Sequence, residues 1–168
     1  EAGHAVHSFL SSSLSLNAFK HTPSVVAVLA SMSMELLTMD QWSVFFDQES
    51  DHTRAKREQL EGIIQTLPWI AIVDKFQHWV YEHPNHSIEA RKEAWVRINR
   101  EFGTGLVDYA GFEDALAWGW HRQMHIFEVP FYYIEYGMAQ LGAIGVWKRF
   151  MEDRATGIGA YKAALKLG

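Results

Sequence analysis

The spacing of apolar side chains along the chain follows a helical period almost throughout. Apolar residues recur three and four positions apart, and no segment shows the sustained alternation that a half-buried strand requires. The pattern therefore predicts an all-α fold, an irregular arrangement of several helices without a sheet.

Start and stop signals divide this pattern into successive helices. Thr22 and Pro23 are expected to begin the second helix and Ser87 to cap the fourth, while Pro68 should start, end or kink part of the third. No repeat or linker interrupts the pattern, so residues 1–168 are expected to form a single helical domain. We expect helices at about residues 2–14, 23–39, 54–81, 88–102, 111–127, 131–151 and 159–167.

The composition of the chain excludes several classes of binding partner. Hydrophobic residues make up 48% of the chain, which is enough to bury a substantial core. The net charge of -5 argues against nucleic acid, and no apolar stretch is long enough to span a membrane. The chain contains no cysteine, so any metal ligands must be His, Asp or Glu. From these features we expect a cytoplasmic protein.

The first four residues carry the first candidate for chemistry. Glu1 and His4 form E-x-x-H, the remainder of the zinc-peptidase helix motif H-E-x-x-H without its leading histidine. In that motif the histidines bind the metal and the glutamate acts as general base on the metal-bound water. The spacing alone is weak evidence, because Glu and His occur three apart in many solvated helices.

A second candidate lies in the aromatic segment 125–137. Tyr132 and Tyr136 are four residues apart just after Pro130, so we expect them to share one helical face and point two phenols toward one cavity. A phenol can stabilise a developing oxyanion, and His125 can assist it or bind substrate. Aromatic residues at this density also occur in ordinary helix interfaces, and the segment by itself leaves both interpretations open.

Together these segments resemble a known family. Residues 1–10, which read E-A-G-H-A-V-H-S-F-L, and residues 23–37 and 125–142 are similar to the catalytic part of the oligoendopeptidase F and thimet-oligopeptidase family of zinc metallopeptidases. The resemblance extends over essentially the whole chain. It implies the helical catalytic half of a zincin-type oligopeptidase, truncated at both ends, whose substrates are short peptides.

The resemblance also implies a role for each candidate residue in hydrolysis. Glu1 matches the general base, and His4 matches the second zinc ligand of the motif. His125 matches the histidine that contacts substrate near the scissile carbonyl. Tyr132 matches the tyrosine that stabilises the oxyanion, and Tyr136 matches a second substrate-contacting tyrosine.

Two features of the sequence depart from the family pattern. The spacing from His125 to Tyr132 is one residue longer than usual, so Tyr133 competes for either tyrosine role. The third zinc ligand of the family is the glutamate of A-E-x-A-S, but the matching segment 27–31 reads A-V-L-A-S and has Val28 at the ligand position.

These departures leave His4 as the one family zinc ligand in the chain. Glu35 lies seven residues beyond Val28, about 10.5 Å along a helix, and is interpreted as an anchoring acid rather than a replacement ligand. His7 is a second candidate replacement. Since catalytic zinc sites use three protein ligands, zinc binding in this chain is expected to be weak or absent.

Two functions follow as hypotheses. The first is a zinc-dependent endopeptidase that hydrolyses short peptides, impaired in this chain. The second is a degenerate, non-catalytic helical module, supported by the continuous apolar run from Val25 to Leu29. In either case we expect apolar surface that drives homo-oligomerisation.

Overall fold

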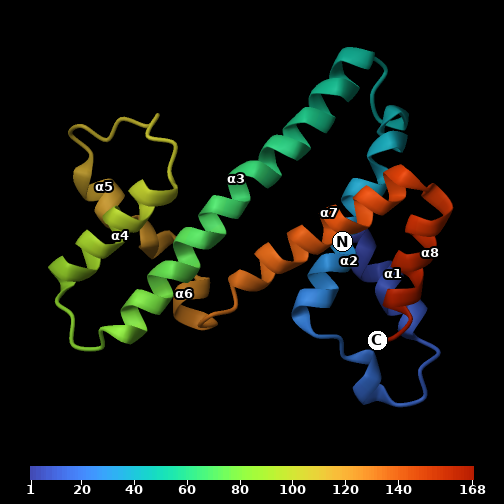
Figure 1. The fold of residues 1–168 in the computed structure, drawn as a ribbon, viewed down its shortest axis with the longest axis horizontal. Helices are drawn as coiled ribbons and strands as arrows, with labels where there is room; N and C mark the ends of the chain where they lie inside the picture. The colour runs from blue at the N-terminus through green and yellow to red at the C-terminus, as the bar shows by residue number, and fades with distance from the viewer. The chain divides into compact units, whose positions relative to one another are not determined.

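The computed structural model describes all of residues 1–168, and every regular element in it is helical (Figure 1). The predicted all-α class is confirmed. Three short 3-10 helices occur at Asn17–Lys20, Met39–Val44 and Gly119–Arg122. The eight α-helices are α1 (Ala2–Ser11), α2 (Ser24–Thr38), α3 (Glu49–Glu82), α4 (Ile88–Phe102), α5 (Glu113–Ala117), α6 (His125–Glu128), α7 (Ile134–Glu152) and α8 (Arg154–Leu165). None of them is both long and apolar enough to cross a membrane.

The chain divides into two compact units. The first unit comprises Glu1–Glu61 and Glu135–Gly168, and the second comprises Gly62–Ile134. Helix α3 contributes its residues 49–61 to the first unit and its residues 62–82 to the second. That residues 1–168 together form a single domain remains a prediction.

Ala30 on α2 is the centre of packing in the first unit. It is fully buried in a cluster with Leu37, Phe150, Tyr161 and Leu165. The hydroxyl of Tyr161 donates a hydrogen bond of 2.6 Å to the carbonyl of Ala30, which ties α8 to α2. Burial raises the pKa of Tyr161 to about 12, so the hydroxyl remains a donor at any physiological pH.

Aromatic rings form the core of the second unit. Trp95 on α4 and Phe76 on α3 meet edge to face with their centroids 5.0 Å apart, and both are almost completely buried. Ile72, Ile98 and Trp120 complete the cluster. Such ring pairs add stabilisation beyond the burial of their area.

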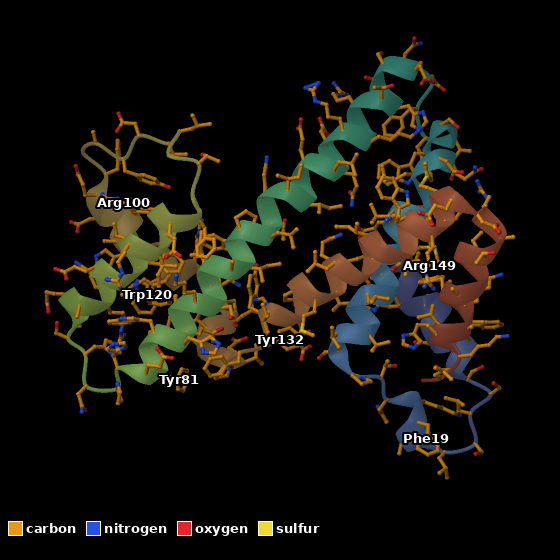
Figure 2. All side chains as sticks on the ribbon, in the orientation of Figure 1. Phe19, Tyr81, Arg100, Trp120, Tyr132 and Arg149 are labelled. Atoms are coloured by element: carbon orange, nitrogen blue, oxygen red, sulfur yellow. The ribbon has the colours of Figure 1, made fainter.

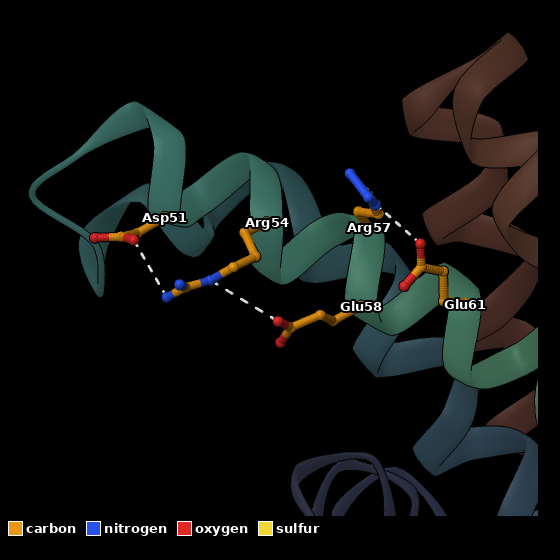
Figure 3. A network of polar contacts seen from close by, with 5 residues as sticks. All are labelled: Asp51, Arg54, Arg57, Glu58 and Glu61. Atoms are coloured by element: carbon orange, nitrogen blue, oxygen red, sulfur yellow. Dashed lines mark hydrogen bonds and ion pairs between the residues drawn. The ribbon is translucent and has the colours of Figure 1, made fainter.

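The first half of α3 presents a solvated charged face, as its sequence predicts (Figure 3). Arg54 contacts Asp51 at 3.2 Å and Glu58 at 3.8 Å, while Arg57 reaches Glu61 at 2.9 Å. The side chains of both arginines are more than two-thirds exposed. These pairs at helical spacing support the helix locally and contribute little to overall stability.

Several expected helix boundaries are wrong. The first helix ends at Ser11 rather than Leu14, because the hydroxyl of Ser12 bonds back to the carbonyl of Phe9 at 2.7 Å and competes with the helical pattern. The second begins at Ser24, since Pro23 has an extended backbone and no side chain caps the helix. Helix α3 continues through Pro68 and starts five residues earlier than residue 54.

The largest correction concerns the helix expected over residues 111–127. This segment is divided into α5, a 3-10 helix and α6, and Trp120 in the 3-10 helix packs against Phe76 of α3 with the ring centroids 5.8 Å apart. Tertiary packing therefore overrides local helix propensity here. In contrast, the fourth helix has the expected bounds, and the hydroxyl of Ser87 caps it by accepting from the backbone N–H of Ala90.

Candidate functional site

The start of α1 packs closely against the middle of α2 in the first unit, and these are the two helices predicted to carry the metal site. Gly3 on α1 lies against the backbone of Ala30 and Ser31 on α2, where an added Cβ would come within 2.3 Å of the Ala30 carbonyl oxygen. The terminal ammonium of Glu1 also donates a hydrogen bond of 3.3 Å to the hydroxyl of Ser31. Only glycine permits such an approach, so this contact fixes where Glu1 and His4 lie relative to α2.

The residues beside this contact do not fit a zinc site. Val28, which the sequence comparison predicts at the third-ligand position, lies on α2 three residues before Ser31, about one helical turn away. An aliphatic side chain cannot bind a metal. No three His, Asp or Glu side chains of the chain are grouped so as to hold a metal ion. His4 is therefore the one predicted ligand present.

The two candidate replacement ligands have other surroundings. His7 is only 3% exposed, and its buried Nε2 has no hydrogen-bond partner. Burial, with a smaller contribution from His4, lowers the pKa of His7 and keeps the imidazole neutral. Glu35 is exposed and accepts a hydrogen bond of 3.1 Å from Gln59, a contact that favours the anchoring interpretation.

Three of the predicted site residues come together in the second unit. The ring of His125, at the start of α6, stacks on Tyr132 with centroids 6.0 Å apart and an interplanar angle of 12°. It also meets Tyr133 edge-on at 4.9 Å. A histidine and two phenols thus share one small region, which supplies donors suited to a carbonyl oxygen or an oxyanion.

A relay of side chains from α3 orients His125. The indole N–H of Trp69 can only donate, and it donates to the Gln123 amide oxygen at 3.2 Å. The Gln123 amide nitrogen therefore faces the Nδ1 of His125, at 2.7 Å, and donates to it. Because Nδ1 accepts, the neutral imidazole carries its proton on Nε2.

Sequence reasoning missed both Trp69 and Gln123 as functional residues. The signal available was faint, a glutamine two residues before the candidate histidine and a tryptophan distant in sequence. Neither feature indicates a contact until the fold brings α3 beside the 3-10 helix.

The environment of Tyr133 keeps its phenol protonated. Burial raises the pKa of Tyr133, and hydrogen bonding with Trp69 and Gln123 offsets part of the increase. The hydroxyl is therefore a neutral hydrogen-bond donor at physiological pH, as a residue that contacts a carbonyl must be.

Phe131 has an unusual backbone that sets the position of the tyrosines. Its φ is +60°, the left-handed region that a bulky residue adopts only at a cost of about 1–3 kcal/mol. The ring of Phe131 packs 5.0 Å from His78 and 4.9 Å from Tyr81, both on α3. These contacts hold the strained residue that turns the chain into Tyr132.

The expected helical face shared by Tyr132 and Tyr136 is wrong. Helix α7 begins at Ile134, so Tyr136 is helical whereas Tyr132 precedes the helix. The left-handed Phe131 delays the helix start. Tyr136 is half-buried in the first unit, where the hydroxyl of Ser24 donates to the neighbouring Glu135 carboxylate and joins α2 to α7.

The first unit thus packs α1 closely on α2, and the second holds an oriented histidine beside two phenols. Comparison with known proteins identifies the class to which the chain belongs. The model of peptidase family M3 matches residues 1–168, and the chain belongs to this family.

Two solved structures support this assignment. PZ peptidase A, solved with an inhibitor, is 35% identical with a TM-score of 0.89, and a structure assigned to oligoendopeptidase F is 34% identical with a TM-score of 0.84. Each matches 100% of this chain, which spans only 30% and 29% of the two solved chains. No curated protein matches. The resemblance seen in the sequence is thus confirmed.

Proposed function

We propose that the chain forms the peptide-contacting part of a zinc-dependent oligopeptidase of family M3, and that it is itself impaired in hydrolysis. Membership of the family supports short peptides as the substrate class. His4 is proposed as a metal ligand and Glu1 as the general base, whose carboxylate would accept a proton from the attacking water. Both residues lie at the start of α1.

The proposed substrate contacts come from the aromatic segment. His125 would donate a hydrogen bond from its Nε2–H to the carbonyl oxygen of the peptide bond, and the Tyr132 hydroxyl would donate one to the same oxygen, both in the bound peptide and when that oxygen becomes the oxyanion. Tyr136 and Tyr133 would contact the substrate. Since Tyr133 touches both His125 and the Trp69–Gln123 relay, it supports the position of the histidine as well.

One observation carries the proposal most directly. Gln123 sets the tautomer of the His125 ring through the contact at Nδ1, and the same ring stacks on Tyr132. A ring with its proton on Nε2 can act as an electrophilic donor toward substrate without being charged.

The impairment follows from the metal ligands. With Val28 in place of a carboxylate, the residues present do not fit a three-ligand zinc site, so no step of hydrolysis is assigned to a metal in this chain. The chain should retain peptide binding better than peptide cleavage.

A second candidate function is a non-catalytic helical module of the same family. The observation that favours it is again Val28, which makes α2 continuously apolar from residue 25 to residue 29. Large apolar side chains such as Phe9 (79% exposed) and Leu141 (61% exposed) would drive homo-oligomerisation. Sedimentation that shows a monomer at all concentrations would contradict this association.

The two candidates differ in how peptides bind. An internally quenched short peptide is titrated against the chain, with tryptophan fluorescence reporting binding and mass spectrometry reporting cleavage. We expect binding with little cleavage, and a roughly tenfold weaker affinity in His125→Ala and Tyr132→Phe, the loss expected for one hydrogen bond. Exposed His21→Ala and Tyr109→Phe are the matched controls and should bind normally.

Three results would contradict the proposal. Efficient cleavage by the unaltered chain would exclude the impairment. Absence of binding would exclude the peptide-contacting function. Equal affinities of the site variants and their controls would leave only the non-catalytic module.

A further inference from the structure

A cavity of ≈ 170 Å³ lies within the second unit, between the C-terminal part of α3, α4 and the segment from Trp120 to Phe127. Its walls are largely apolar and aromatic. Tyr81 and Trp120, which Figure 2 labels, form two of them, and Phe76, Val80 and Ile126 form others. This volume is many times the space that one water needs, and it is enough for the side chain and backbone of one residue.

A buried amide in the cavity wall has no partner. Gln77 is 1% exposed, and neither its amide nitrogen nor its amide oxygen makes a hydrogen bond. The buried indole N–H of Trp120 is also without an acceptor. Buried polar groups are almost always paired, so an unpaired amide and an unpaired indole N–H beside a cavity are groups that a ligand can satisfy. These atoms are themselves covered in the unliganded chain, so the Gln77 side chain must turn toward the cavity to reach a ligand.

A cation faces the same cavity. The guanidinium of Arg91 lies 5.3 Å from the centre of the Trp120 ring, and its Nε donates to His86 at 2.6 Å. Arg91 forms no ion pair, and no acidic residue lines the cavity. The remaining guanidinium nitrogens therefore favour an anionic group, and Arg suits a carboxylate in particular.

We infer that this cavity binds the carboxyl-terminal residue of a short peptide that ends in an apolar side chain. Arg91 pairs with the terminal carboxylate, and the Gln77 amide bonds both the N–H and the C=O of the last peptide group. The aromatic walls enclose the side chain. The inference concerns binding alone and holds whether or not the chain hydrolyses peptides.

The same chemistry can come from two sources, a peptide end or a simple apolar acid. Both offer a carboxylate to Arg91, but only a peptide end offers a donor and an acceptor to Gln77. Three small probes separate them: N-acetyl-leucine, its carboxamide N-acetyl-leucinamide, and 4-methylpentanoic acid, which lacks the amide.

The test is an NMR titration of the 168-residue chain with each probe, following the side-chain N–H signals of Gln77 and Trp120. N-acetyl-leucine should shift both signals. The carboxamide should bind at least tenfold more weakly because it loses the pairing with Arg91, and the simple acid about fivefold more weakly because it leaves Gln77 unpaired. Equal binding of the acetylated acid and its carboxamide, or shifts confined to other residues, would overturn the inference. Tighter binding of the simple acid would overturn the peptide assignment.

Variants with matched controls sharpen the result. Arg91→Gln should weaken the binding of N-acetyl-leucine at least tenfold and leave the binding of the carboxamide unchanged. Arg97→Gln, at an exposed position on the same helix, should change the affinity for neither probe. Gln77→Met should remove the preference for the acetylated acid over the simple acid. Gln140→Met, at a buried glutamine of the first unit, should preserve that preference.

Stability gives a readout that does not depend on ligand. Since the Gln77 amide is unpaired in the unliganded chain, Gln77→Met removes a desolvation cost and should leave Tm unchanged or higher. A clear fall in Tm would show that the amide already has a partner, which would overturn the inference. Failure of all three probes to bind would also overturn the inference. It would leave the proposed function, which the quenched-peptide experiment tests, unaffected.

Discussion

The two units of the chain differ in how they arrange the proposed site residues. In the first unit, Gly3 packs directly on Ala30 and Ser31, and Val28 lies one turn away at the proposed metal-ligand position. In the second unit, His125 is in contact with both neighbouring tyrosines and is oriented by a relay from α3. One unit retains the packing and lacks the ligand, whereas the other retains both packing and polar groups.

The difference shows that helix packing and site chemistry are separate constraints. Valine at the proposed ligand position offers no metal contact, yet it packs readily on a half-buried helix face. A change at Gly3 would instead disrupt the fold. The architecture can therefore stay close to that of the solved relatives whichever residue stands at the proposed ligand position.

The contact at Gly3 gives the largest expected effect. Gly3→Ala places a Cβ 2.3 Å from the Ala30 carbonyl oxygen and 2.4 Å from the Ser31 Cα, so the two helices must separate. We expect a loss of roughly 3 kcal/mol in the free energy of unfolding, as for strong overpacking. Urea denaturation followed by circular dichroism measures it.

Gly62 provides the matched control. It lies inside α3, and a Cβ added there meets nothing within 4 Å. Gly62→Ala should therefore stabilise the chain by about 0.5–1 kcal/mol through helix propensity. If both substitutions changed stability alike, the close approach of α1 to α2 would be wrong.

The relay in the second unit gives an intermediate effect. Gln123→Leu removes the half-buried bonds to Trp69 and His125, which should cost about 1–2 kcal/mol. The imidazole should also lose its preference for the Nε2–H tautomer, a change that ¹⁵N NMR detects. Gln59→Leu, which removes only the contact with Glu35, should leave the tautomer unchanged.

His83 offers an internal reference for that experiment. Its Nδ1 lies 2.8 Å from the Trp79 carbonyl, which can only accept, so His83 must carry its proton on Nδ1. The two histidines should therefore show opposite tautomers in the unaltered chain. The same tautomer at both would contradict the relay.

The smallest expected effect is the acid dependence of the α8 cap. Hydrogen bonds from the Thr156 hydroxyl, the Thr156 backbone and the Ala155 backbone lower the pKa of Asp153 below its ordinary value of 3.8. A carboxyl whose pKa is lowered on folding stabilises the fold above its unfolded pKa, and this stabilisation is lost as the pH falls through the folded value.

Stability of the unaltered chain should thus decline below about pH 4. Asp153→Asn keeps an oxygen that can cap the helix but does not titrate. The variant should show a smaller decline in thermal stability between about pH 5 and pH 2. Identical pH profiles for the two proteins would exclude the contribution of Asp153.

The regular helices could be predicted from the sequence where local signals agreed with packing. Ser87 caps α4 and Phe102 ends it as expected, because a good cap and a strong apolar period coincide there. The segment 111–127 could not be predicted, since Trp120 within it packs against Phe76, which is distant in the sequence. The break before α7 depends on Phe131, whose left-handed backbone is held by rings on α3.

The candidate site was predictable in residue type and less so in geometry. The motif at Glu1 and His4 and the aromatic cluster around Tyr132 could be recognised from spacing and resemblance. The orientation of His125 could not be predicted, because it depends on Gln123, and Gln123 is held by Trp69, which is distant in the sequence. The catalytic, substrate-binding and metal-binding roles of these residues remain predictions.

The central claim is that Val28 is what separates this chain from a family zinc site. A zinc titration by calorimetry compares three proteins, each with a histidine added before Glu1 to complete the motif. The first keeps Val28 and the second carries Val28→Glu. The third carries Val25→Glu, one turn earlier on α2, and serves as the control. The account predicts at least 100-fold tighter zinc binding with Val28→Glu alone, as expected when a third ligand completes the site. Equal affinities with Val28 and with Val28→Glu would contradict it.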